Sequence, residues 1–305
     1  MINILRLGNH RCGRSALKEP LSFPSYTRPT QGTIFCGGIA EDYDKCKTYG
    51  LIITARCDVM NEKTQIYNYL PVVPLDEWIN RDGTLILTER LYGEISNRMR
   101  NVLRTADFST SILDSQEPDI ILKTLFPIVG DKKILGARKQ FEGLCQKWEK
   151  IREAENLRAL DAPFFHLSAI EPTLSERVVK ELAQQKLSGY YFLKSIELDG
   201  DDAGYVVLLR EVHHIRREII NTLIRHGIKY SDFEEMCRTQ PIHKGLLNIL
   251  RDDVAMAVSV LESPHVEHMM QIFSNLFGRI GIPDISPEYT QELCQRQPSF
   301  RRFSA

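Results

Sequence analysis

Two groups of strand-like segments, separated by a long helical stretch, limit the fold of this chain more than any other feature. The groups lie in 33–79 and 189–213, while 80–188 carries apolar residues at three- and four-residue intervals, as amphipathic helices do. Neither group has enough strands to form a stable sheet alone. We therefore expect both groups to build one small, mostly antiparallel barrel, with a helical insertion between its two halves.

The first half of this barrel is predicted from three apolar segments, TIFCGGI, LIITA and TQIYNYLPVVPL. The last segment contains Pro71 and Pro74, and because proline cannot donate a ladder hydrogen bond, we expect this strand at an edge. In the second half, two apolar runs flank the turn sequence DGDDAG, which predicts a hairpin. The periodicity of 214–305 predicts a C-terminal helical region, and 1–32, rich in Pro, Ser and Arg, predicts a basic extended arm.

Composition excludes several classes of function. The 305 residues carry a net charge of -1, which gives no general case for nucleic acid or a membrane surface. No apolar run is long enough to span a bilayer, and the N-terminus lacks the pattern of a secretory signal, so we expect a cytoplasmic protein. No dinucleotide, P-loop, nucleophile-elbow or HExxH pattern occurs, and we expect no cofactor.

The 7 cysteines form no CxxC pair, so we expect buried free thiols and no metal site. The regular spacing of Cys36, Cys46 and Cys57 is the single feature that hints at a metal.

A first candidate site is the polar segment ARCDVMN, which follows a predicted buried strand. Arg56 would bind phosphate, Cys57 would act as a nucleophile if a base lowered its pKa, and Asp58 would serve as a base. The alternative is structural. In that case Asp58 and Asn61 bond to the turn backbone, Cys57 packs inward and Arg56 is solvated.

A second candidate site is the segment REVHHIRRE, between the second strand group and a helix expected to begin near Ile215. His213 and His214 point to opposite faces, so at most one enters a given site. One of them would act as an acid or base, and the surrounding arginines would hold phosphate. Alternatively, the pair lies at a loop edge and bonds to Glu211 or Glu218. The basic residues of this cluster are Arg210, Arg216 and Arg217.

The strand residues GLIITARCD and YNYLPVVPL, with GYYFLKS and GYVVLLREVHHI downstream, resemble split small barrels of uncharacterised bacterial proteins distantly similar to MazF/PemK-type toxins. This resemblance implies an SH3-like barrel, an endoribonuclease activity, and a place in toxin–antitoxin or phage-defence loci. It also implies that Thr54 and Arg56 correspond to the hydroxyl and arginine at the barrel mouth of those toxins. The chain lacks their early Gly-Asp strand and their Arg-Pro-Val run.

Two main hypotheses follow. The first is a cytoplasmic bacterial interaction module in a phage-defence or toxin–antitoxin-like complex, with a protein partner expected and RNA or DNA as the other option. The second is a metal-independent endoribonuclease in which Arg56 holds the scissile phosphate and His213 or His214 transfers the proton. A third, a cysteine-nucleophile enzyme, requires an exposed Cys57.

Overall fold

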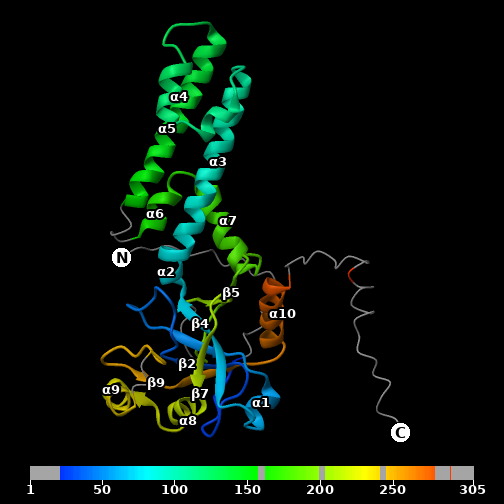
Figure 1. Cartoon of the computed structure of the whole chain (residues 1–305), viewed down its shortest axis with the longest axis vertical. Helices are drawn as coiled ribbons and strands as arrows, with labels where there is room; N and C mark the ends of the chain where they lie inside the picture. Colours follow the sequence, from blue (N-terminus) through cyan, green and yellow to red (C-terminus); the bar gives the residue numbers. More distant parts are fainter. Residues whose placement is uncertain (1–20, 157–161, 199–202, 241–244, 279–288, 290–305) are drawn as a thin grey trace, which may run out of the picture.

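The computed structural model describes residues 21–156, 162–198, 203–240, 245–278 and 289. A curled antiparallel sheet with helices on its faces forms the body of the molecule, and a group of long helices extends from one end of that body (Figure 1). The predicted combination of helices with a mostly antiparallel sheet is confirmed.

Within the described residues, eight strands form the main sheet, in the order β1-β10-β2-β3-β4-β6-β5, and β7 also pairs with β4. Every pairing is antiparallel. The sheet curls into a half-barrel: Ser259 Oγ on β10 donates to the Ile196 carbonyl after β5, 2.5 Å away, although these strands are far apart in the strand order. The strands are β1 (Leu21–Ser22), β2 (Thr33–Cys36), β3 (Tyr49–Ile52), β4 (Ile66–Pro74), β5 (Tyr190–Leu193), β6 (Tyr205–Leu208), β7 (His213–Arg216) and β10 (Ala257–Leu261).

The helices between β4 and β5 form a separate unit with its own core, and we call α3 to α6 the helical projection. Leu87, Leu91, Ile95 and Met99 of α3 are buried against α5, as the apolar periodicity predicts, whereas Leu85 is exposed. The elements of this part of the chain are α2 (Leu75–Trp78), η1 (Ile79–Gly83), α3 (Thr84–Thr105), η2 (Thr110–Asp114), α4 (Pro118–Leu125), α5 (Lys132–Asn156), α6 (Pro163–Ser168) and α7 (Pro172–Ala183).

A second apolar cluster joins the projection to the sheet, and we call it the joint. Trp78 is fully buried there beside Val73 of β4 and Val206 of β6, and Val178 and Leu182 of α7 complete the contact. Ile86 of α3 packs against the same cluster, so apolar packing also joins the projection to the body.

Both faces of the sheet are covered by further helices. On one face, Phe35 and Tyr69 pack with the buried side of α8, and on the other, Ile34 and Leu51 pack with Val266 of α10. The remaining elements are α1 (Arg56–Met60), α8 (Arg217–His226), β8 (Ile228–Lys229), α9 (Tyr230–Thr239), β9 (Val254–Ala255) and α10 (His265–Phe277).

The prediction that β4 lies at an edge is wrong. β3 pairs with one side of β4, and β7 and β6 pair in turn with its other side. That second side has no pair at Leu70 and Pro71, where the partner changes from β7 to β6. A strand with this interruption accommodates a proline in the middle of a sheet, because the ladder is already broken there.

The predicted C-terminal helical region, 214–305, contains the helices α8, α9 and α10 but also short strands. Part of β7, all of β8 and β9, and β10 lie within it, and α8 begins at Arg217, not near Ile215. These strands have two to five residues. Segments this short show too little alternation to distinguish a strand from part of a helix.

The predicted N-terminal arm is in part a component of the sheet. Residues 1–20 lie outside the described residues, but Leu21 and Ser22 form β1 against β10. Gln31 Nε2 donates to the Ile53 carbonyl over 3.2 Å, and the Gly32 N–H donates to the Ile52 carbonyl over 2.8 Å. Residues 21–32 therefore contact the sheet at both ends of the segment.

Replacement of Gly50 by alanine should destabilise the protein by about 1–3 kcal/mol, because overpacking a core costs that much. A Cβ at Gly50 would lie 2.8 Å from the Tyr69 ring and closer still to the Phe35 ring. In the matched control, Gly93→Ala in α3, the new Cβ meets no atom within 4 Å, and helix propensity should give up to about 1 kcal/mol of stabilisation. Urea denaturation of both variants measures the difference, and equal stabilities would contradict the packing between β3 and β4.

Candidate functional site

The Cys57–Asp58 step lies in the first turn of the short helix α1, which three residues separate from the end of β3. Cys57 is exposed, with its Sγ 3.6 Å from Asp58 Oδ1, so the expectation that it packs inward is wrong. The residue that α1 buries is Val59. Asn61 Nδ2 donates to the Cys57 carbonyl over 2.7 Å, so Asn61 closes the turn through a carbonyl and not through an amide.

Arg56, at the start of α1, is exposed. The pKa of Glu267 on α10 is lowered mainly by a hydrogen bond from Ser263, and the charge of Arg56 makes only a small contribution.

His213 and His214 lie on β7 and point to opposite faces of the sheet, as expected from strand alternation. His214 is exposed and is the cross-strand partner of Asn68 on β4. The Asn68 N–H donates to Thr54 Oγ1 over 2.7 Å. Thr54 and His214 therefore flank one residue, Asn68, on the outer surface of β4 and β7.

His213 belongs to a half-buried cluster on the other face. Its Nε2 lies 2.6 Å from Glu211 Oε1, so the predicted alternative in which a histidine bonds to Glu211 is confirmed for His213. The imidazole stacks on the Tyr69 ring, with centroids 5.7 Å apart and planes at 28°. Glu211 Oε1 also accepts the Glu41 N–H at 2.5 Å. A carboxylate and a ring therefore hold this imidazole in one orientation.

The three predicted arginines have different partners. Arg217 donates to the Glu62 carbonyl over 2.9 Å and forms a 3.5 Å ion pair with the Glu62 carboxylate. Arg216 lies 4.0 Å from Glu218. Arg210 contacts Ser188 Oγ at 3.4 Å, just before β5. Arg217 thus connects the segment after α1 to the start of α8. Arg210 is not part of this contact, because its partner is Ser188 near β5.

The chemical groups of the two candidate segments are not joined directly. Among the described residues, no hydrogen bond or ion pair links Arg56, Cys57 or Asp58 to His213 or His214. The histidine that has a carboxylate partner faces away from the surface that carries Thr54 and His214. Residues from the two candidate segments share a surface at one place. It is the exposed group formed by Thr54, Asn68, His214 and Arg216.

Sequence reasoning missed a polar cluster in the joint. Asp82 lies in the π-helical turn η1, and burial raises the pKa of its carboxyl group, while the nearby hydroxyl groups of Tyr190 and Tyr43 and the charge of Arg81 oppose this shift. The Tyr43 hydroxyl is buried without a hydrogen-bond partner of normal geometry. These groups come from three distant segments, so the Asp-Gly pair that the sequence shows in η1 gives no sign of the cluster.

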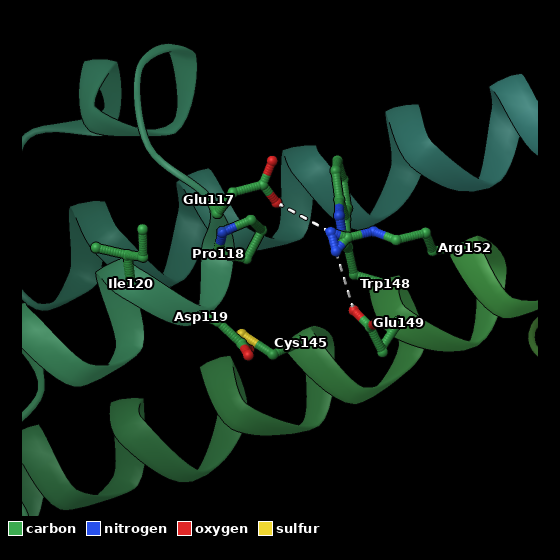
Figure 2. Close-up of a pocket in the computed structure, with 8 residues that line it drawn as sticks. All are labelled: Glu117, Pro118, Asp119, Ile120, Cys145, Trp148, Glu149 and Arg152. Carbon is green, nitrogen blue, oxygen red and sulfur yellow. Dashed lines mark ion pairs between the residues drawn. The ribbon is translucent and has the colours of Figure 1, made fainter.

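A pocket of about 250 Å³ lies between α4 and α5 in the projection. Figure 2 shows the residues that line it. The Arg152 guanidinium lies between the carboxylates of Glu117 and Glu149, 3.5 Å from each. Cys145 lies beside Asp119, and burial raises the pKa of its thiol to about 12. A thiol with such a pKa is protonated at neutral pH and is a poor nucleophile.

The described part of the chain contains no group of three His, Cys, Asp or Glu side chains placed to hold a metal ion. Of the cysteines expected to be buried thiols, Cys36 and Cys145 are buried, Cys46 and Cys237 are partly buried, and Cys12 and Cys294 lie outside the described residues. Among the described helices, none is both long and apolar enough to cross a membrane. No protein-family model, curated protein or solved structure matches this chain.

Replacement of Asp82 by asparagine should stabilise the protein increasingly as the pH rises. The folded-state pKa of Asp82 is raised, so its contribution to stability is complete below the ordinary aspartate pKa of about 4 and is lost as the pH rises through the folded-state value. Asparagine keeps a neutral polar group at this position at every pH. Urea denaturation of both proteins between about pH 4 and 7 measures the difference, and a difference that stays flat or falls with pH would contradict the burial of this charge.

Proposed function

We propose that this chain is a protein-interaction module of the bacterial cytoplasm that works within a toxin–antitoxin-like or phage-defence complex. The observation that carries the proposal is the helical projection, which has a core of its own and extends away from the sheet (Figure 1). A sheet that carries a rigid helical unit of this kind presents a surface far from its own centre to another molecule. The family resemblance supports the cellular setting.

The arrangement of the predicted catalytic groups favours binding over catalysis. Acid–base catalysis requires a donor and an acceptor within hydrogen-bond reach of the same reacting atom. His213 is oriented by Glu211 on one face, His214 is exposed on the other, and Arg56 is exposed on α1. The two histidines and Arg56 therefore do not point toward one common reacting atom.

We further propose that the half-barrel is an SH3-like barrel and that the helices between β4 and β5 are an insertion into it. In support, β4 and β6 are adjacent in the sheet although α2 to α7 separate them in the chain. A barrel of this kind would keep its mouth at the loops near α1 and β7, where the predicted site residues lie.

The alternative function is a MazF/PemK-like, metal-independent endoribonuclease. One observation favours it: Thr54 and His214 flank Asn68 on an exposed surface that also carries Arg216. A hydroxyl, an imidazole and a guanidinium on one surface are groups that contact an RNA phosphate. RNA binding without cleavage would use the same surface.

The interaction proposal predicts that the full chain, isolated with an affinity tag from its native cells, retains a partner protein in stoichiometric amount. Treatment with nuclease during isolation should leave this partner bound, because the contact is between proteins. Gel electrophoresis and mass spectrometry measure the outcome. An isolated chain without a protein partner, or a partner lost on nuclease treatment, would contradict the proposal.

The same proposal predicts that the purified chain leaves single-stranded and structured RNA intact. The variants Arg56→Ala and His214→Ala should be indistinguishable from the wild type in a gel-based cleavage assay. Cleavage that is lost in both variants and kept in His226→Ala, a change of another histidine in α8, would replace the interaction proposal with the endoribonuclease.

A further inference from the structure

The loop that joins α4 to α5 lies at the end of the projection away from the sheet (Figure 1). Large apolar side chains are exposed in this loop. Ile128 is 79% exposed and Val129 is 86% exposed, and Leu135 in the first turn of α5 is 39% exposed. Single exposed apolar residues are normal on protein surfaces, but adjacent β-branched residues at a loop apex are not. We call residues 123–139 the projection tip.

Buried aromatic residues and hydrogen bonds hold the tip in place. Phe126, directly before the exposed pair, is fully buried and lies against Phe108 and Phe141, with ring centroids 5.3 and 5.1 Å apart. Arg138 donates to the Phe126 carbonyl, and Asp131 Oδ1 accepts the Ile134 N–H at 2.9 Å at the start of α5. A loop anchored at both ends presents Ile128 and Val129 in a fixed position, which lowers the entropic cost of binding.

The tip is also positively charged in a chain whose net charge is -1. Residues 120–140 contain five basic side chains and one acidic side chain. Lys133 pairs with Asp107, and Asp131 caps α5. Within the described residues, the exposed Lys123, Lys132 and Lys139 form no ion pair. On α5, Lys132, Leu135 and Lys139 are spaced so that they share one face, with the apolar residue between the two charges.

From these observations we propose that the projection tip docks into an apolar pocket, rimmed by carboxylates, on a partner protein. Ile128 and Val129 would enter the pocket, and the unpaired lysines would meet the acidic rim. This inference rests on the proposed interaction function and assigns it to a surface and to a partner of defined chemistry.

Other occupants fit the tip less well. Membrane-surface anchors favour Trp and Tyr at the lipid interface, and the tip has neither. Proteins that bind nucleic acid strands stack bases on aromatic side chains, and the one aromatic residue of the tip, Phe126, is fully buried. A symmetric contact between the tips of two copies would bring like charges together.

A photo-crosslinking amino acid placed at position 129 of the full chain, in its native cells, tests the proposal. The matched control is position 26, because Tyr26 is 78% exposed and lies on the body of the molecule. We expect at least about fivefold more crosslinked protein from position 129, joined to a partner segment that contains Asp or Glu. In the position-129 background, Lys132→Glu with Lys139→Glu should reduce the yield about tenfold, whereas Lys132→Arg with Lys139→Arg should keep it.

With the partner identified in this way, Ile128→Ser with Val129→Ser should weaken its binding to the purified full chain about tenfold in titration calorimetry. These side chains are exposed, so the melting temperature should match that of the wild type. The pair of charge-reversal changes is an independent second test of the same surface.

Several results would overturn the inference. They are equal crosslinking at positions 26 and 129, crosslinks to lipid, to nucleic acid or to a second copy of the chain, and sedimentation of the wild type, but not of the serine variant, with phosphatidylglycerol vesicles. A partner that is retained equally by the wild type, the serine variant and the charge-reversal variant would refute the tip as its site and leave the proposed function intact. An isolated wild-type chain with no partner would refute both.

Discussion

The pairing of β4 on both of its sides is the constraint on which the rest of the structure depends. Its alternating side chains enter three different apolar clusters: Tyr69 packs toward α8, Leu70 toward α10, and Val73 into the joint with Trp78. Each fully buried side chain of this size contributes about 1.5–3 kcal/mol. The chain then passes from Pro74 directly into α2, so the strand that organises the sheet also positions the short helix that leads into the projection.

The parts of the fold that the sequence predicts are those determined by local residues. The long helices show their apolar stripe because many turns repeat it, and the β5–β6 hairpin is predicted because both strands flank one polar turn. β10 is different, because its position depends on pairing with residues of β2, such as Ala257 with Phe35, that are remote in the chain. The central position of β4 likewise depends on β6 and β7, which follow it only after the whole projection.

In the candidate site, too, the features that depend on neighbouring residues were predictable, and those that depend on remote residues were not. The opposite orientations of His213 and His214 and the pairing of His213 with Glu211 were predictable, because they follow from strand alternation and from neighbouring residues. The exposure of Cys57 was not, because it depends on how the five residues of α1 turn to bury Val59. The environment of Asp82 was not predictable either, since Tyr43 and Tyr190 reach it from other parts of the chain.

The position of the joint at one end of α3 determines how far the other end of the projection moves when the joint changes. The 22 residues of α3 make a rod about 33 Å long, at about 1.5 Å per residue, with one end at the packed cluster around Trp78. A rotation of only about 10° at that end would displace the other end by about 6 Å, because the rod is about 33 Å long. A small change of packing in the joint, next to the half-buried Asp82, would therefore produce a larger displacement at the outer end of α3.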